Sequence, residues 1–556
     1  MIKGKDYFYV VNKEQLIGCC NYFKNKGALG FDLETSGLIP REGHIISYQL
    51  GTKEKQFVIH AGSFKHGDLG GIFDILMNPD KLKIGHNLKF DFKWMYQHHG
   101  VALNMIHDTM VIESILNKGR PNHRLGLAKV LPAYCPDAPE LDKTTRLEFV
   151  GQAQSLHLTE EQQLYAALDV KFMIPMCIGQ RQLAKLFNMT DLIQLENDTV
   201  IPTAMMEHNG IYIDVDKWLD LEADAIEQRT IAKDELDQFF FDYEVPKEVE
   251  QISMDLFEDK ISTVNYNSPM QLKSALSWVL GFAIPNTNIE ELKKHKQKHP
   301  AIKALLNYRE HNKAVTTYGS TFIEKYVNKE TRRIHSTMDS IRADSGRYGS
   351  RDPNMQNIKS AQKYRTPFCT SDPLDRSMIS ADYSGCELRL IAELSGEEAW
   401  LECFEKDYDM HSYVASLLFN LDYFEITKNN KIKPEYKAFR AKAKNINFGV
   451  AYGMGAGRLA NSLNISFEEA IELLDAFWTQ FPKIKIFLTK MVRSGRNRGY
   501  AISPLDNRRR WLVDFNYMIP KQKSHAANIC KNMPFQAEII GKTIDSSAQL
   551  CYNYYA

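Results

Sequence analysis

The sequence predicts a multidomain protein of mixed α/β and α+β class. The chain has 556 residues, enough for several domains of ordinary size, and its hydrophobic content of 44% suffices for several cores. In the N-terminal third, apolar strands alternate with helical segments, which is typical of an α/β layer. Between about residues 191 and 329, helical segments dominate, which indicates a second region of different architecture.

Charge and cysteine content indicate the compartment of the protein but exclude few functions. Lys plus Arg and Asp plus Glu number 69 each, so any site for a polyanion must come from local clustering. The nine Cys are scattered without a CxxC pair, which favours free thiols over a disulfide framework or a zinc site. No stretch approaches the roughly 18 apolar residues of a membrane span. The N-terminus has no signal or transit pattern, so we expect a cytoplasmic protein without a membrane partner.

The segment "GALGFDLETSGL" at 27–38 predicts a strand that carries two acids. Asp32 and Glu34 are two residues apart, so both side chains point to one face of the strand. Two acids on one face repel each other unless a proton or a cation lies between them. The alternative is an exposed strand end, and the pair alone does not decide. The following "HIISYQLGTKEKQFVIH" predicts a hairpin.

Two further acids favour a metal site. Asp91 follows Asn87 by one helical turn in "IGHNLKFDFKWM", and Asp169 follows Tyr165 in the same way in "YAALDV". Oxygen ligands from a strand and two helices are what a pair of Mg²⁺ ions requires. By contrast, Asp108 in "IHDTMVIESIL" is expected to cap the next helix instead of binding metal.

These segments resemble the three motifs of the 3′→5′ proofreading exonucleases, which place an acidic quartet and a Tyr on a ribonuclease-H-like fold. The similarity covers roughly residues 1–185, and we expect this domain to span 1–190. The resemblance implies that Tyr165 orients the attacking water between two Mg²⁺ ions, with Mn²⁺ as a possible substitute. The implied metal ligands are Asp32, Glu34, Asp91 and Asp169.

The middle of the chain combines basic helices with a polar loop. Residues 191–214 predict a long helix ended by Gly210 and then a strand. Taken alone, the Lys-rich and His-rich run at 291–313 is typical of a solvated helix face. The loop "ADSGRYGSRDPNMQNI" is rich in amides, which suit hydrogen bonds to the minor groove and the sugar-phosphate backbone. Its candidate DNA contacts are Arg347, Asn354, Gln356 and Asn357.

Two later segments carry further chemistry. "ISADYSGCELRL" at 379–390 predicts a buried strand that ends at Asp382 and leads into a helix, so that this acid is either a helix cap or a metal ligand. In "RAKAKNINFGVAYG", two cations and two aromatic residues recur every four residues and form one helical stripe. The cations suit a triphosphate and the aromatic rings suit a base and sugar. The stripe consists of Arg440, Lys444, Phe448 and Tyr452.

Together with "NYNSPMQL" at 265–272, which is similar to a thumb segment, these motifs resemble family A DNA polymerases over essentially the entire chain. The loop matches "TGRLSS..PNLQNI" with Ser345 in place of Thr. The resemblance implies a right-hand polymerase domain at 191–556 that binds primer-template DNA and deoxynucleoside triphosphates, with two Mg²⁺ ions. The expected parts are a thumb at about 215–330, a palm at about 191–214 and 331–430, and fingers at about 431–530.

The resemblance also implies individual roles. Asp382 would bind both metals and the main-chain carbonyl of Tyr383 one of them, while Glu387 would exclude ribonucleotides by crowding the 2′ position. His411 falls near the incoming nucleotide. The segments "PLDNRRRWL" and "NMPFQAEII" imply contacts to template and primer from Arg508, Arg509, Arg510, Asn532 and Gln536.

In the family, the second catalytic Asp stands in a His-Asp-Glu motif after the helix that corresponds to "NMPFQAEII". This sequence has no counterpart of that motif. None of the 16 His is followed by Asp-Glu, so we expect an incomplete palm. The chain is then the large piece of a split polymerase with a separate C-terminal polypeptide, a shortened product, or a 3′→5′ exonuclease whose polymerase-like region only binds primer-template DNA. The complete triphosphate stripe favours a split polymerase over an exonuclease that only binds DNA. The sequence does not decide between a split polymerase and a shortened product.

Two further expectations concern its class and setting. The intact quartet disfavours an inert DNA-binding scaffold. Without a preceding 5′-nuclease domain, the organisation is closer to phage polymerases, in a bacterium or a phage-infected host cell.

Overall fold

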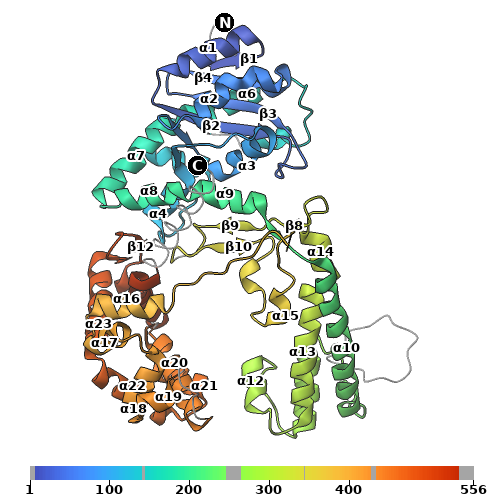
Figure 1. Cartoon of the computed structure of the whole chain (residues 1–556), viewed down its shortest axis with the longest axis vertical. Helices are drawn as coiled ribbons and strands as arrows, with labels where there is room; N and C mark the ends of the chain where they lie inside the picture. Colours follow the sequence, from blue (N-terminus) through green and yellow to red (C-terminus); the bar gives the residue numbers. More distant parts are fainter. Residues whose placement is uncertain are drawn as a thin grey trace. The chain divides into compact units, whose positions relative to one another are not determined.

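The computed structural model describes residues 7–140, 144–245, 264–343, 345–372, 374–427, 434–451 and 453–536. These residues form two compact units, each built from more than one stretch of the chain (Figure 1). The first unit comprises 1–208, 338–349 and 381–556, and the second comprises 209–337 and 350–380.

A six-stranded mixed sheet forms the N-terminal part of the first unit, in the order β1-β4-β3-β2-β5-β6. Its central strand β2 pairs antiparallel with β3 and parallel with β5. The pair β3 and β4 is antiparallel, which confirms the predicted hairpin. The strands are β1 (Tyr7–Val10), β2 (Ala28–Thr35), β3 (Ile45–Gly51), β4 (Gln56–His60), β5 (Leu82–Gly85) and β6 (Ile106–Asp108).

Helices cover both faces of this sheet. Leu29, Phe31 and Leu33 of β2 belong to a large core with the first four helices. On the opposite face, smaller cores join the sheet to α5, α6 and α7. The helices are α1 (Lys13–Lys24), α2 (Gly70–Met77), α3 (Leu88–His99), α4 (Thr109–Asn117), α5 (Leu127–Tyr134), α6 (Glu160–Lys171) and α7 (Met173–Leu186).

The rest of the first unit is mostly helical, and its C-terminal helices surround a core of their own, whereas the helices directly after residue 189 pack on the core of the sheet. The long helix predicted after residue 191 is broken at Thr199 into α8 (Thr190–Asp198) and α9 (Val200–Asn209). Two short strands, β11 (Tyr500–Ile502) and β12 (Arg509–Trp511), form a hairpin, and residues 520–536 are helical. The other helices are α16 (Cys386–Ser395), α17 (Glu398–Glu405), α18 (Met410–Phe419), α19 (Tyr423–Ile426), α20 (Lys437–Ala451), α21 (Ala456–Leu463), α22 (Phe467–Gln480) and α23 (Pro482–Arg498).

The second unit contains a long helical pair, α10 (Val215–Phe239) and α13 (Pro300–Tyr318), as the predicted helical stretch requires. Ser268 caps α11 (Pro269–Leu280), accepting the amide of Gln271. Its other helices are α12 (Ile289–Lys294), α14 (Ser320–Tyr326) and α15 (Gln362–Arg365). The short strands β7 (Ile211–Tyr212) and β8 (Arg333–Ile334) pair with each other. A further pair, β9 (Thr337–Asp339) and β10 (Gly349–Arg351), has residues assigned to each of the two units.

The buried strand predicted to end at Asp382 is wrong for the described residues. Residues 374–384 contain no strand, and the side chain of Ile379 is 89% exposed. A strand forms only where a neighbour satisfies its backbone groups, and no described strand pairs with this segment. The helix predicted after it is present as α16.

Across the described part of the chain, none of the helices combines the length and the apolar character that crossing a membrane would require.

Candidate active sites

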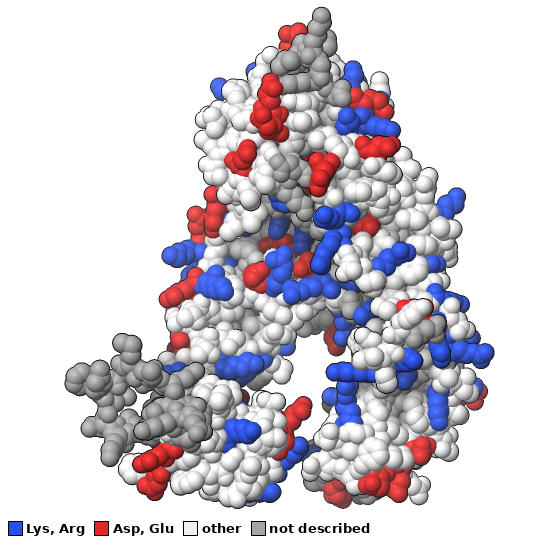
Figure 2. All heavy atoms as spheres, turned by 180° about the vertical axis from the view of Figure 1, so that it is seen from behind, with Lys and Arg blue, Asp and Glu red and all other residues white. Residues whose placement is uncertain are grey.

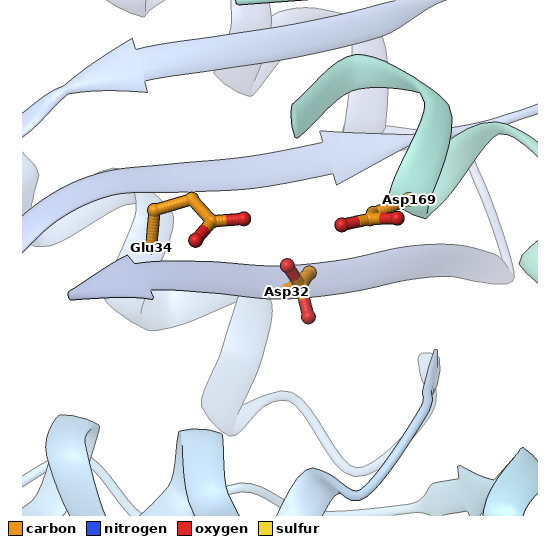
Figure 3. A group of neighbouring side chains, drawn as sticks. All are labelled: Asp32, Glu34 and Asp169. Atoms are coloured by element: carbon orange, nitrogen blue, oxygen red, sulfur yellow. The ribbon is translucent and has the colours of Figure 1, made fainter. Parts of the chain in front are cut away.

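Three carboxylates converge on the sheet face covered by α6 (Figure 3). Asp32 and Glu34 extend from β2, and Asp169 extends from α6 toward them. Ligand oxygens of these three residues lie within 4.8 Å of one another. Gly30 permits the close packing, since a Cβ there would lie 2.5 Å from the carbonyl oxygen of Val170. Hence a larger residue at 30 would displace the end of α6 that carries Asp169.

Asp91 is the fourth acid of this cluster. It lies in the first turn of α3, and its negative charge raises the pKa of both Asp32 and Glu34. Its Oδ1 is buried without a hydrogen-bond partner among the described residues. Three of the four predicted acids thus have ligand oxygens within 4.8 Å of one another, and Asp91 lies close enough to raise the pKa of two of them.

The start of α3 is held by Asp108. Its Oδ1 accepts hydrogen bonds from the amides of Met110 and Val111, at 3.0 and 3.2 Å, which confirms the predicted cap of α4. The same oxygen accepts the amide of Asn87 at 3.0 Å, directly before α3. One carboxylate therefore fixes the first turns of two helices, and through α3 the position of Asp91.

Burial raises the pKa of every acid in the cluster, and mutual repulsion adds to the effect for Asp32 and Glu34. The pKa of Asp91 rises to about 8 and that of Asp169 to about 7, both chiefly through burial. The Tyr165 hydroxyl donates a hydrogen bond to Asp169, which partly offsets the rise in its pKa. An all-oxygen cluster with an unsatisfied carboxylate oxygen fits Mg²⁺, which would replace the retained protons.

Arg146 was missed by the sequence analysis. It lies on the short 3-10 helix Thr145–Phe149, which packs near α6. Its positive charge lowers the pKa of all four acids and of Tyr165, opposing the effect of burial. No local pattern marks this Arg, because its importance arises only from tertiary proximity.

These shifts predict that the cluster destabilises the metal-free protein as pH rises. Asp91 keeps its proton up to about pH 8 and Asp169 up to about pH 7 in the folded protein, whereas both lose it near pH 4 when unfolded. The folded state therefore binds more protons between these values, and stability must fall across this window. We expect Mg²⁺ to raise the melting temperature by several degrees at pH 8 and little at pH 5. Thermal unfolding in EDTA and in Mg²⁺ measures this, and an Asp169→Asn variant should show a smaller pH dependence and a smaller Mg²⁺ effect. Equal Mg²⁺ effects at both pH values would contradict the prediction.

The triphosphate stripe lies on α20, with Arg440, Lys444 and Phe448 on one helix as predicted. Tyr452 lies outside the described residues. From α18, His411 reaches this helix: its ring lies 5.5 Å from that of Phe448, and its Nδ1 lies 3.2 Å from Nδ2 of Asn447. Burial lowers the pKa of His411 to about 4, so its imidazole is neutral at pH 7.

Two candidate residues of the polymerase region contact each other. Glu387, in the first turn of α16, forms an ion pair with Arg347, which is half exposed. Partial burial raises the pKa of Glu387, and the charge of Arg347 opposes that rise. Asp382 is exposed and Tyr383 is 49% exposed, in the segment without regular structure.

The polar loop presents exposed amides in the second unit. Asn354, Gln356 and Asn357 are all exposed around the 3-10 helix Met355–Asn357. Asn354 accepts the amide of Gln356 at 3.0 Å, so part of its hydrogen-bonding capacity shapes the turn. Their contacts with DNA stay a prediction.

The structure contradicts the predicted DNA contact of Arg508. This residue is 5% exposed, and its guanidinium pairs with Glu196 of α8 and with Asp506. Glu196 is 1% exposed and requires a positive partner there. The sequence could have indicated a buried acid in need of a positive partner, since Glu196 shares the buried face of its helix with Leu192 and Ile193.

The neighbouring arginines differ from Arg508. Arg509 donates to the carbonyl oxygen of Phe187 at 2.8 Å and lies over its ring, whereas Arg510 is only partly buried. Farther along, Oδ1 of Asn532 is buried without a described hydrogen-bond partner, and Gln536 is partly buried at the end of the described helix.

Removing Arg508 should therefore affect stability more than DNA binding. Arg508→Ala would leave the Glu196 carboxylate buried without its main partner, which typically costs about 3–5 kcal/mol. We expect a lower urea midpoint with little change in DNA affinity. A double variant, Arg508→Met with Glu196→Leu, should recover much of the loss because it removes both charges. Normal stability combined with weakened DNA binding would restore the original assignment.

The fold combines a sheet that carries an acidic cluster with a separate, largely helical region that carries a basic and aromatic helix. These two regions are the arrangement expected of a protein with an exonuclease domain followed by a polymerase domain. Residues 239–544 match the model of DNA polymerase family A, and residues 7–179 match that of the 3'-5' exonuclease. The chain belongs to DNA polymerase family A and includes a 3'-5' exonuclease domain.

Several known proteins are similar to this chain. DNA polymerase I of Borreliella burgdorferi is 28% identical over 554 residues, which is 95% of this chain and 56% of that protein. The thermostable DNA polymerase I of Thermus thermophilus is 32% identical over 308 residues, 53% of this chain and 35% of that protein. The chain thus spans between a third and just over half of these relatives.

A solved structure confirms the fold. The POL domain of Pol1 from M. smegmatis, in a complex with DNA primer-template and dNTP, superposes with a TM-score of 0.78 at 20% identity. The match covers 97% of this chain and 88% of that chain. The multidomain fold class predicted from the sequence is therefore confirmed.

Proposed function

We propose that the chain is a DNA-templated DNA polymerase that proofreads with a 3′→5′ exonuclease, using two divalent metal ions at each site. The observation that carries this proposal is the cluster of Asp32, Glu34 and Asp169, with Asp91 acting on it electrostatically, within the matched exonuclease domain. We assign the exonuclease to 1–190 and the polymerase to 191–556. Within the latter we propose a thumb at about 215–330, a palm at about 191–214 and 331–430, and fingers at about 431–530.

In the exonuclease, the four acids would hold Mg²⁺ or Mn²⁺. When bound, the ions would supply an activated water and stabilise the leaving 3′ oxygen. Burial raises the pKa of Tyr165, so its hydroxyl keeps its proton and can donate to a water or a phosphate oxygen. Arg146 adds positive charge beside the same cluster, where the scissile phosphate would lie.

In the polymerase region, Arg440 and Lys444 would neutralise a triphosphate while Phe448 and neutral His411 contact the nucleotide. Glu387 would limit space at the 2′ position, and Asp382 with the carbonyl of Tyr383 would bind metal. Primer-template DNA is the proposed partner. Lys and Arg gather in patches on the face shown in Figure 2, despite the zero net charge, and such patches suit a phosphate backbone.

A second candidate is a 3′→5′ exonuclease whose polymerase-like region only binds primer-template DNA. The exposure of Asp382 on a segment without a strand favours it. The grouping of His411, Arg440 and Phe448 favours synthesis, because gripping DNA needs no triphosphate site. We therefore propose that synthesis by these 556 residues needs an added C-terminal polypeptide with the His-Asp-Glu motif.

The experiment that tests the function uses a primer-template labelled at the 5′ end of the primer. With Mg²⁺ alone, we expect stepwise shortening from the 3′ end, faster on single-stranded DNA than on duplex. EDTA should stop it. Digestion that releases the 5′ label first, or digestion indifferent to EDTA, would contradict the proposal.

A further inference from the structure

Asp409 joins the two helices that carry the candidate nucleotide contacts. It caps α18, accepting the amide of Ser412 at 3.0 Å. It also binds Arg440 of α20 through two parallel hydrogen bonds, Nε to Oδ2 at 2.7 Å and Nη2 to Oδ1 at 2.8 Å. On its backbone side, the amide of Asp409 donates to the Tyr423 hydroxyl at 2.9 Å. The carboxylate is therefore held on several sides and cannot follow a moving Arg.

This arrangement fixes the direction of the Arg440 guanidinium. Both side chains are largely buried, with 21% of Arg440 and 19% of Asp409 exposed. Guanidinium has five N–H donors in one plane, and Asp409 uses two, on one edge of the fork. The remaining three donors face away from Asp409. An Arg held in this way loses little conformational freedom when it binds a phosphate.

The same carboxylate fixes the position of α18 relative to α20. His411 is the second residue after the Asp409 cap, and it contacts Asn447 and Phe448 of α20. Arg440 and His411 are thus both positioned by one residue that was absent from the candidate contacts. Neither helix alone would align them.

We propose that Asp409 is the positioning residue of the nucleotide site, holding Arg440 and the His411 helix ready for the triphosphate. This inference rests on the proposed polymerase function. It assigns Asp409 no contact with the nucleotide. The opposing view is that Asp409 competes with the triphosphate for Arg440, in which case its removal would tighten binding.

The test measures binding of dATP and dAMP by calorimetry, with the whole chain in its Asp32→Ala, Glu34→Ala form, on a primer-template whose primer ends in a dideoxynucleotide. Asp409→Asn keeps a capping side chain but not the charged two-point contact with Arg440. Asp409→Ser serves as a second capping variant. Asp422→Asn is the matched control, because Asp422 caps α19 in the same way, accepting the amide of Phe424.

We expect Asp409→Asn to weaken dATP binding by about 10-fold and to change dAMP binding less than about 2-fold, since Arg440 serves the triphosphate. Asp422→Asn should change neither. Tighter or unchanged dATP binding, or an equal loss for dATP and dAMP, would overturn the inference. If the chain with Asp409 intact does not prefer dATP to dAMP, the proposed polymerase function fails, whereas the exonuclease proposal is tested by digestion.

Discussion

Replacing Asp32 and Glu34 together by alanine is expected to reduce 3′→5′ digestion by about three orders of magnitude or more. Both side chains belong to the group of oxygens within 4.8 Å, so the double variant removes two of the three acids in it. Asp169 and Asp91 alone would bind divalent ions weakly and in the wrong geometry. Release of single nucleotides from a 5′-labelled single strand, over a range of Mg²⁺ concentrations, measures the effect.

The control for this prediction is Asp80→Ala, which removes an exposed carboxylate after α2. It should digest DNA normally. The double variant should still bind single-stranded DNA and should be more stable than the unmodified protein at pH 8 without metal, because repulsion in the cluster is relieved. Digestion at the unmodified rate would refute the assignment of the metal site.

Local periodicity predicts that Asp32 and Glu34 share one face, whereas the addition of Asp91 and Asp169 as ligands was implied by the resemblance to the exonuclease motifs. Two acids two residues apart on an apolar strand must share a face, and the structure places Asp32 and Glu34 accordingly. The cap formed by Asp108 was predictable for the same reason, since capping depends on neighbours in the chain. Arg146 was not predictable, because its proximity to these acids depends on how its 3-10 helix packs near α6.

The errors concern residues whose environment is set by distant segments. Arg508 was assigned to DNA by the resemblance of its segment to family A polymerases, yet the buried Glu196 binds it. The predicted strand at Ile379 had the right apolar pattern, but a pattern without a pairing neighbour forms no strand. For Arg508, the partner lies far away in the sequence.

The second large effect concerns synthesis. Primer extension by the Asp32→Ala, Glu34→Ala form, in which digestion cannot mask synthesis, should be very weak for these 556 residues alone. Asp382 is exposed, and a single carboxylate offers poor geometry for two ions. Losing such positioning can cost orders of magnitude in rate. Adding a C-terminal polypeptide with the His-Asp-Glu motif should restore extension by about 100-fold or more.

We propose that such a polypeptide would cover exposed apolar side chains of the described residues. Leu374 is 99% exposed and Ile379 is 89% exposed in the segment that leads to Asp382, and apolar side chains so placed gain free energy when covered. The same polypeptide with the Asp of its motif changed to Ala should bind equally well but leave extension weak, which separates binding from catalysis. Asp382→Ala should abolish the restored extension, whereas Asp375→Ala, an exposed acid of the same segment, should not. Strong extension by the 556 residues alone that survives Asp382→Ala would show that the synthetic site lies elsewhere.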